Sequence, residues 1–343
     1  MKFLSDKVVE RLRENADAPD LSGTRYRLLE RVARGGMGVV YAAHDEALDR
    51  RVALKVLDAP HADGGLAKRL NREARVLARL EHPGIVPVHD VGTLADGRVF
   101  YTMKFVQGQR LDKYIESVAS LADRLRIFLR ICDSVAFAHA RGVLHRDLKP
   151  ANVMVGAFGE VLVMDWGLAK VLREAQSPDG ERDADVTVLE PRTRSRNDSS
   201  STQATEATGR GTVLGTPGYM SPEQARGESE NLDQRSDIYS LGAVLLFLAR
   251  GSTEAPSRQS QPLDKSLAAI CTKATAENPA ARYGNASDLA ADVSRYLDGL
   301  PVSARKESVL DKLGRFYRRY NVAILLIAAY LLMRVLVLLF FHR

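Results

Sequence analysis

The chain has 343 residues, of which 45% are hydrophobic, and a formal net charge of +6. This length allows one large domain or two ordinary ones with tails, and the composition is that of a globular protein with a sizeable core. Cys132 and Cys271 are too few for a disulfide framework and too far apart for a metal-ligand motif, which fits a reducing compartment.

Residues 1–25 predict a polar lead-in without the long apolar stretch of a signal peptide. From Tyr26 to Asp58, apolar-rich runs flank a glycine cluster and predict strands. Apolar residues recur at helical spacing over 66–81, which predicts an amphipathic helix. Further strands are expected at 85–92, 98–106, 152–155 and 161–164, and helices at 110–118 and 120–141.

Residues 172–212 are rich in charged residues, Ser, Thr and Gly, and nearly lack large apolar side chains. Such a stretch cannot bury enough surface to offset its ordering entropy, so we expect disorder in the unmodified protein. Order is expected again from Gly215, with helices at 222–226, 236–250, 264–275 and 286–298.

Residues 322–341 are apolar except for Arg334, and basic residues gather in the preceding segment 299–320. Twenty helical residues match a hydrocarbon core of about 30 Å, and the many apolar side chains offset one arginine. The sequence predicts a single-pass membrane helix with the preceding body in the cytoplasm. The alternative is a C-terminal helix packed on the domain. We expect the basic segment to meet a membrane surface and expect no nucleic-acid partner.

Two groups of residues indicate phosphate chemistry in the N-terminal part. The segment from Ala33 to Val40 carries Gly35, Gly36 and Gly38 between predicted strands, where backbone N–H groups could approach phosphate oxygens. The alternative is a glycine-rich hairpin turn. Lys55 ends the next strand-like run and could reach the phosphates, with Glu73 of the amphipathic helix available to hold it.

A more specific pattern runs from His145 to Asn152 and reads HRDLKPAN, followed by Asp165-Trp166-Gly167. Phosphoryl transfer needs a carboxylate to receive a hydroxyl proton and oxygen ligands for Mg²⁺. Asp147 suits the first role, and Asn152 and Asp165 suit the second.

With these motifs, the chain resembles the eukaryotic-type (Hanks-type) protein kinases, and among them the bacterial membrane-anchored Ser/Thr kinases, over roughly residues 26–298. The resemblance implies an α+β, bilobal fold with a small β-rich N-lobe and a larger helical C-lobe, into which 172–212 is inserted as an enlarged activation loop. It also implies ATP and Mg²⁺ as cofactors, with Mn²⁺ as a substitute, and protein substrates with Ser or Thr hydroxyls.

The resemblance assigns catalytic roles to Asp147, Lys149, Lys55 and Glu73, and metal binding to Asn152 and Asp165. Glu223 would form a buried ion pair with Arg282, and Asp237 would brace the catalytic loop. Nucleotide contacts would come from Ala33, Gly35, Gly38, Val40, Ala53, Lys55, Met103, Lys104 and Val106.

Phosphorylation of the activation loop is expected at Thr212 first and Thr208 second, where Arg146 could pair with the phosphate. A transient homodimer would serve such autophosphorylation. The chain departs from the family pattern at Ala33, a glycine in the family, and at Trp166, a phenylalanine. The short polar segment 252–263 also replaces a loop and helix of the C-lobe.

Two other functions remain open from the sequence. One is a pseudokinase that binds nucleotide or partners without transfer. The other is a small-molecule kinase, against which the docking-loop motif from Gly215 to Glu223 argues.

Overall fold

The computed structural model describes residues 18–35, 38–57, 78–166, 170–171, 218–228, 232–251, 263–305, 324–335 and 337. Glu73 and most of the helix expected at 66–81 lie outside these residues. So do the activation-loop insertion 172–212, with Thr208 and Thr212, and most of the segment 252–263.

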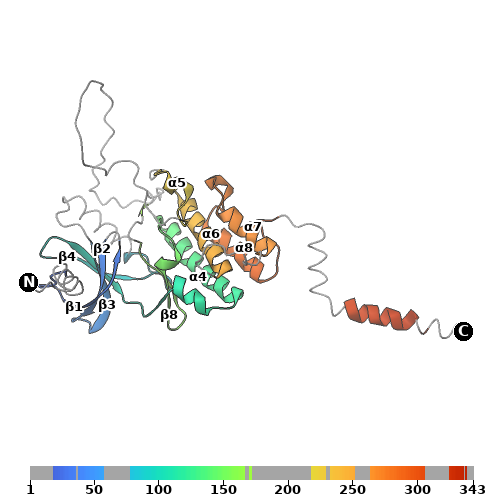
Figure 1. Ribbon diagram of the computed structural model, residues 1–343, viewed down its shortest axis with the longest axis horizontal. Helices are drawn as coiled ribbons and strands as arrows, with labels where there is room; N and C mark the ends of the chain where they lie inside the picture. The colour runs from blue at the N-terminus through green and yellow to red at the C-terminus, as the bar shows by residue number, and fades with distance from the viewer. Residues whose placement is uncertain are drawn as a thin grey trace, which may run out of the picture.

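The first lobe is a five-stranded antiparallel sheet in the order β1-β2-β3-β5-β4 (Figure 1). The strands are β1 (Tyr26–Gly35), β2 (Gly38–Asp45), β3 (Arg50–Leu57), β4 (Val88–Thr93) and β5 (Val99–Lys104). The sequence placed the start of β4 earlier, at residue 85. Pro87 lacks an N–H donor and delays the strand, so that Ile85 forms only an isolated bridge with Val163.

One face of this sheet is an apolar core. Val39, Tyr41 and Leu54 alternate along β2 and β3 and pack with Tyr26 of β1 and Phe100 of β5. Leu21, which the sequence puts in the polar lead-in, is also buried in this cluster. Because alternate residues of a strand point to opposite faces, the intervening residues of β2, β3 and β5 are directed toward the second lobe.

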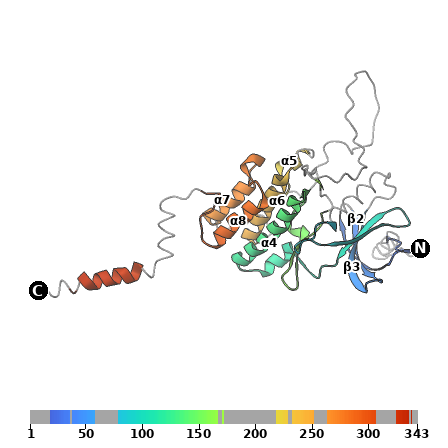
Figure 2. The same ribbon diagram turned by 180° about the vertical axis from the view of Figure 1, so that it is seen from behind.

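The second lobe is mostly helical. It lies beside the sheet in the front view of Figure 1 and in the back view of Figure 2. Its central helix, α4 (Leu121–Ala140), buries a stripe that includes Leu125, Phe128, Cys132 and Val135, at the spacing of one helix face. This stripe packs against α6 (Gln234–Arg250) and α8 (Ala286–Leu297). The predicted α+β architecture with two lobes is therefore confirmed.

The remaining elements are short and connect these layers. The helix expected at 110–118 is divided into α3 (Leu111–Tyr114) and the 3-10 turn η1 (Ile115–Ser117). The strand pairs β6–β8 and β7–β10 include elements that the sequence did not predict. The other elements are β6 (Gly108–Arg110), β7 (Val143–Leu144), η2 (Pro150–Asn152), β8 (Val153–Gly156), β9 (Val161–Val163), β10 (Lys170–Val171), α5 (Pro222–Ala225), α7 (Lys265–Ala274) and η3 (Pro279–Ala281).

After α8 the chain folds back onto the helical lobe. Val302 is buried in the main core, and the carboxylate of Asp292 on α8 receives hydrogen bonds from the backbone N–H groups of Ser303 and Ala304 at 2.7 and 2.9 Å. The Ser303 hydroxyl and the Tyr283 phenol donate to the same carboxylate at 2.8 and 2.9 Å. We call this arrangement, Asp292 with residues 302–305, the Asp292 clasp.

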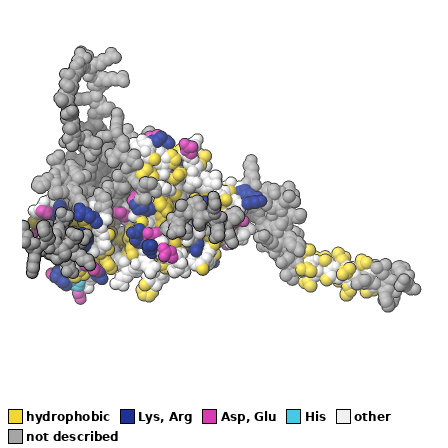
Figure 3. Space-filling model, viewed as in Figure 1, with side chains coloured by type: hydrophobic (Ala, Val, Ile, Leu, Met, Phe, Trp, Pro, Cys, Tyr) yellow, Lys and Arg dark blue, Asp and Glu magenta, His cyan; other side chains and the backbone are white. Residues whose placement is uncertain are grey.

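The segment expected to cross a membrane, 322–341, is described only in part. Residues 324–335 are helical, lie away from the folded body, and expose large apolar side chains such as Leu326 and Leu332 (Figure 3). Within the part of the chain that the structure describes, no helix has both the length and the apolar character of a membrane span.

Candidate active site

The strand register gathers the predicted nucleotide residues on one face of the sheet. Ala33 of β1 lies opposite Val40 of β2, Val40 lies opposite Lys55 of β3, and Ala53 lies opposite Met103 of β5. Cross-strand partners project to the same side, and this side is the one opposite the apolar core. The face therefore forms an apolar wall with a single cation, Lys55, among these residues.

The glycines of this wall mark where β1 turns into β2. Gly35 and Gly38 are cross-strand partners at the ends of the two strands, and Gly38 has a φ of 150° that residues with a Cβ rarely adopt. Gly36 and Met37, between them, lie outside the described residues. Ala33 pairs with Val40 directly after an irregularity in the strand register between Arg31 and Ala33, and the pairing then continues to Gly35.

The segment after β5 connects the two lobes. Lys104 is exposed, whereas Met103 and Val106 are partly buried. The backbone N–H of Lys104 donates to the Pro87 carbonyl at 3.1 Å. Of the two backbone groups of Lys104, only the carbonyl therefore remains a candidate for an adenine contact.

Opposite this wall, the loop from His145 to Asn152 brings three functional side chains together. Lys149 Nζ lies 2.7 Å from Asp147 Oδ2, and Asn152 Nδ2 donates to the same oxygen at 3.1 Å. Asn152 also donates to the Asp147 carbonyl at 2.7 Å, which fixes the loop around the carboxylate. Asp147 is thus an oriented acceptor beside a cation.

Asp237 of α6 fixes the backbone of this loop from below. Its carboxylate, which is 1% exposed, accepts the N–H groups of His145 and Arg146, both at 2.8 Å, and contacts His139 Nε2 at 2.7 Å. Arg146 has a φ of 69°, a left-handed conformation that needs such support in a non-glycine residue. The brace expected from the sequence is confirmed.

Lys55 and Asp165 join the two walls of the cleft, because the Lys55 ammonium group forms an ion pair with the Asp165 carboxylate. Asp165 has a left-handed φ of 58°, and its side chain remains 43% exposed. Burial would raise the pKa of Asp165, but the nearby charge and hydrogen bond of Lys55 outweigh it and lower the pKa. Asp165 therefore stays ionised and available to a cation.

Trp166 is a buried hydrophobic residue, as the sequence predicted for its position. Its side chain is 4% exposed, its indole N–H donates to the Val163 carbonyl at 3.2 Å, and its ring lies 4.6 Å from that of His145. The His145 ring in turn contacts the Met164 carbonyl at 3.0 Å. Trp166 thus links the segment that carries Asp165 to His145 at the start of the catalytic loop.

Asn152 and Asp165 form a donor set that fits Mg²⁺. An amide oxygen and a carboxylate are hard ligands, and Mg²⁺ commonly takes one or two protein oxygens and completes its shell with water and phosphate. Asn152 uses its Nδ2 atom for Asp147, so its Oδ1 atom is the one that suits a metal. Within the described ranges, no cluster of three His, Cys, Asp or Glu side chains offers an alternative metal site.

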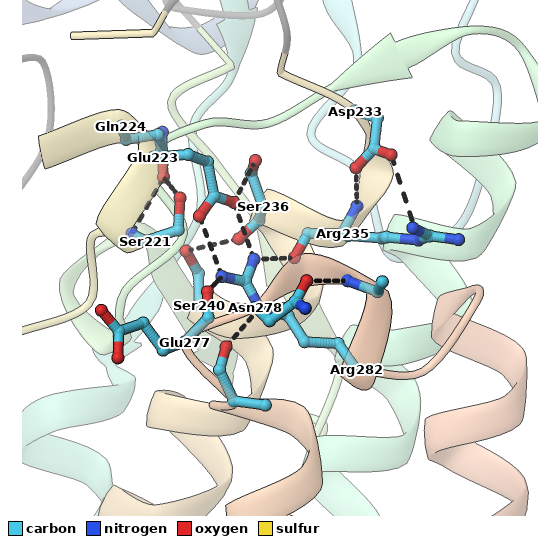
Figure 4. A network of polar contacts seen from close by, with 12 residues as sticks. Ser221, Glu223, Gln224, Asp233, Arg235, Ser236, Ser240, Glu277, Asn278 and Arg282 are labelled. Atoms are coloured by element: carbon cyan, nitrogen blue, oxygen red, sulfur yellow. Dashed lines mark hydrogen bonds and ion pairs between the residues drawn. The ribbon is translucent and has the colours of Figure 1, made fainter. Parts of the chain in front are cut away.

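A polar network joins α5 to the start of α6 and to Arg282, which follows η3 (Figure 4). Arg282 binds Glu223 through two hydrogen bonds of 2.7 and 2.8 Å, and both residues are buried. Gln224, also on α5, donates from Nε2 to the Arg146 carbonyl at 2.8 Å. The predicted Glu223–Arg282 ion pair is confirmed, and α5 is tied directly to the catalytic loop.

The sequence did not identify two partners of the site. Gln224 was not singled out, because a glutamine on a short helix carries no chemical signature. Tyr101 of β5 lies directly opposite Lys55 on the cleft face and is 9% exposed. A register prediction for β3 and β5 could have found it.

Three comparisons place this geometry among known proteins. The family model described as "Protein kinase domain" matches residues 26–297. The chain is 35% identical over 334 residues to "Serine/threonine-protein kinase PknD" of Chlamydia trachomatis serovar L2b, covering 88% of this chain and 34% of the relative. The protein of the same description from Protochlamydia amoebophila is 33% identical over 317 residues, with 80% and 30% covered.

The chain spans about a third of the length of the curated relatives it matches. Among solved structures, the crystal structure of the Mycobacterium tuberculosis PknI kinase domain superposes with a TM-score of 0.54 at 25% identity. It covers 79% of this chain and 95% of that one.

Proposed function

Because the chain belongs to the protein kinase domain family, we propose that it transfers the γ-phosphate of ATP to Ser and Thr hydroxyls of proteins. The observation that carries this proposal is the arrangement of Asp147, Lys149 and Asn152, with two side chains holding one carboxylate oxygen. The curated relatives of the same description support the choice of Ser and Thr as acceptors.

In this mechanism the protein positions the reactants and neutralises charge. Asp147 accepts a hydrogen bond from the substrate hydroxyl and aligns its oxygen with the γ-phosphorus. The new P–O bond forms as the bridging P–O bond to the β-phosphate breaks, which leaves ADP, and the hydroxyl proton passes to Asp147. Lys149, beside Asp147, faces the transferred phosphoryl group.

The nucleotide is held from the sheet side. Val40, Ala53 and Met103 provide the apolar surface for adenine, and the backbone carbonyl of Lys104 and backbone groups of Val106 bond its edge. Backbone N–H groups between Ala33 and Gly38, including those near Gly35, approach the phosphates, and Lys55 binds them, with Glu73 as its second carboxylate partner. When bound by Asn152 and Asp165, Mg²⁺ or Mn²⁺ supplies charge neutralisation at the phosphate oxygens.

Substitution of the proposed base tests the activity. Full-length wild type and Asp147→Asn are incubated with Mg-ATP and generic protein substrates, and phosphate is located by mass spectrometry. We expect the variant to lose at least about 100-fold in rate, because a positioned acid–base group contributes that much or more. Binding of nucleotide without phosphate transfer by the wild type would replace the proposal with a nucleotide-binding pseudokinase.

We propose that the kinase phosphorylates its own activation loop at Thr212 and Thr208. The support is Arg146, which lies beside the catalytic base and could pair with a phosphate. Phosphate on these residues in wild type but not in Asp147→Asn is the expected result. Mixing Asp147→Asn with active protein distinguishes transfer between two copies, which needs a transient homodimer, from transfer within one.

We also propose that residues 322–341 anchor the chain in a membrane, with the kinase body in the cytoplasm. The apolar character of this segment, its exposed apolar side chains at 324–335, and the basic residues before it support the proposal. Membrane fractionation with and without carbonate extraction tests it. Release of the full chain into the soluble fraction by carbonate would contradict the anchor.

A further inference from the structure

Tyr101 places a buried phenol on the face of the sheet that carries Lys55. Strands β3 and β5 pair Lys55 with Tyr101 directly, so the two side chains project from the same face. Both residues are buried, at 6% and 9% exposure. A buried tyrosine hydroxyl needs a hydrogen-bond partner, and a buried ammonium group needs several.

The ammonium group of Lys55 lies near the side chain of Tyr101. Lys55 Nζ lies 6.0 Å from the centre of the Tyr101 ring, at the far limit of a cation–π contact. Because the phenol oxygen projects beyond the ring, this separation leaves room for Nζ at the hydroxyl end. On its other side, the ammonium group meets Asp165.

We propose that Tyr101 is a positioning residue for Lys55, whose phenol oxygen accepts a hydrogen bond from the ammonium group and directs it toward the nucleotide phosphates. This inference rests on the proposed phosphotransfer function and names a part of the site that the motifs do not contain. Asp165 belongs to the C-lobe side of the cleft, whereas Tyr101 lies on the same sheet as Lys55. The phenol can therefore hold the ammonium group independently of how the two walls approach each other.

The electrostatics agree with this geometry. Burial would lower the pKa of Lys55, but interactions with Tyr101 and Asp165 outweigh it and raise the pKa. Among the described residues, His145 and Lys149 also face Asp165, from the catalytic loop. The ammonium group thus remains charged in a site where desolvation alone would favour the neutral amine.

The test is Tyr101→Phe in the full chain, with Tyr41→Phe as the matched control. Tyr41 is a buried phenol on the opposite face of the same sheet, within the apolar core, and outside the cleft. For Tyr101→Phe we expect KM for ATP to rise about 3- to 10-fold while kcat stays within about twofold, because ATP binding is weakened in ground and transition states alike. Tyr41→Phe should leave KM unchanged.

A purely structural role would lower the active fraction, and hence kcat, without changing KM. Equal KM for ATP in wild type and Tyr101→Phe would overturn the proposal, as would the same rise in Tyr41→Phe.

A second readout does not need activity. Equilibrium titration with Mg-ATP should give a Kd about 3- to 10-fold higher in Tyr101→Phe than in the wild type, and an unchanged Kd in Tyr41→Phe. An unchanged Kd in Tyr101→Phe would contradict the positioning role, even if the wild type transfers no phosphate. A raised Kd in an inactive protein would retain Tyr101 as a positioning residue for Lys55 and reject the phosphotransfer function instead.

Discussion

At the scale of single residues, Asp237 has the largest influence on the catalytic loop. One buried carboxylate accepts two backbone N–H groups of that loop and contacts His139. Burial raises the pKa of Asp237, but the hydrogen bond and charge of His139 outweigh it and lower the pKa, so the carboxylate stays ionised. Its charge and its acceptor atoms together maintain the left-handed Arg146.

We predict that Asp237→Asn lowers the free energy of unfolding by about 2–4 kcal/mol, because an amide cannot replace both acceptor oxygens in a buried site. Phosphoryl transfer should fall with it, since the loop that carries Asp147 loses its support. Urea unfolding and steady-state kinetics measure the two effects.

Asp233→Asn is the control on the same helix, because it keeps a capping oxygen for the Arg235 N–H at an exposed position. We expect it to change stability by less than about 0.5 kcal/mol. An Asp237→Asn variant as stable as this control would contradict the bracing role.

Glu223 makes folding stability depend on acid pH. Burial would raise the pKa of Glu223, but the hydrogen bonds of Arg282, its own backbone and Ser236 outweigh it and lower the pKa to about 2, from 4.5. Because the pKa of Glu223 is lower in the native state than in the unfolded state, its ionised form stabilises the fold at pH values above the unfolded-state pKa of 4.5. This contribution is lost as the pH falls from about 4.5 to about 2.

We therefore predict that Glu223→Gln loses less folding stability than the wild type as the pH falls from about 4.5 to about 2. At pH 7 the variant should be less stable by about 3–5 kcal/mol, because Arg282 is left as an unpaired buried charge. Chemical unfolding as a function of pH measures both effects. Glu228→Gln, which breaks an exposed pair with Arg226, should change stability by less than about 1 kcal/mol. Parallel pH profiles for wild type and Glu223→Gln would contradict the prediction.

At the scale of elements, the Asp292 clasp extends the folded unit beyond α8. Five hydrogen bonds converge on one carboxylate, from Tyr283, from the N–H and hydroxyl of Ser303, from the N–H of Ala304 and from the guanidinium group of Arg295. Val302 adds apolar burial next to them. The clasp therefore holds residues beyond the end of the last helix.

We predict that Asp292→Asn loosens this segment, because its amide group cannot accept all of these donors. Backbone N–H groups of Ser303 and Ala304 should lose about tenfold or more in hydrogen-exchange protection, as expected for the loss of about 1–2 kcal/mol of local stability. Mass spectrometry of peptides covering 298–305 measures the change. Asp288→Asn, at an exposed position one turn earlier on α8, should leave those peptides unchanged. Equal exchange in both variants would show that Val302 alone holds the segment.

Residues whose chemistry is local to a motif could be predicted from the sequence. The fixed spacing of Asp147 and Asn152 predicted that the two belong to one site, and the structure brings them into contact, while their chemical roles stay predictions. Apolar periodicity located α4 and α6 within about two residues. Tyr101 and Asp292 could not be predicted, because their partners depend on strand register and on a chain reversal. Glu73 stays a prediction. The ion pair that the structure does describe for Lys55 is with Asp165, a contact that depends on how the two lobes meet.

At the scale of the whole molecule, two separate apolar cores lie on either side of the proposed nucleotide site. One lies behind the sheet around Leu54 and Phe100, and the other lies among α4, α6, α7 and α8. Lys55 belongs to the first lobe and Asp165 to the second, so their ion pair crosses the boundary. A nucleotide that contacts both walls should therefore stabilise the two lobes together.

We predict that Mg-ATP raises the thermal unfolding temperature of the wild type, by an amount equivalent to about 2.7 kcal/mol at 100 times Kd. Lys55→Met should abolish most of this shift, because the phosphates lose their cation. Lys113→Met, an exposed substitution on α3, should keep it. Differential scanning fluorimetry with increasing nucleotide measures the shifts. A full shift in Lys55→Met would contradict the proposed phosphate contact.

The Asp292 clasp also determines how far the catalytic cleft can move if residues 322–341 are anchored as proposed. Because the clasp holds residues up to Arg305 on the folded body, seventeen residue steps separate that body from the proposed anchor. Even fully extended, these steps span at most about 60 Å. The kinase body would then stay close to the bilayer, where substrates on the same membrane reach millimolar effective concentrations. Modest intrinsic affinity for such substrates would suffice. Opening the clasp would lengthen the connection and let the kinase body move farther from the bilayer.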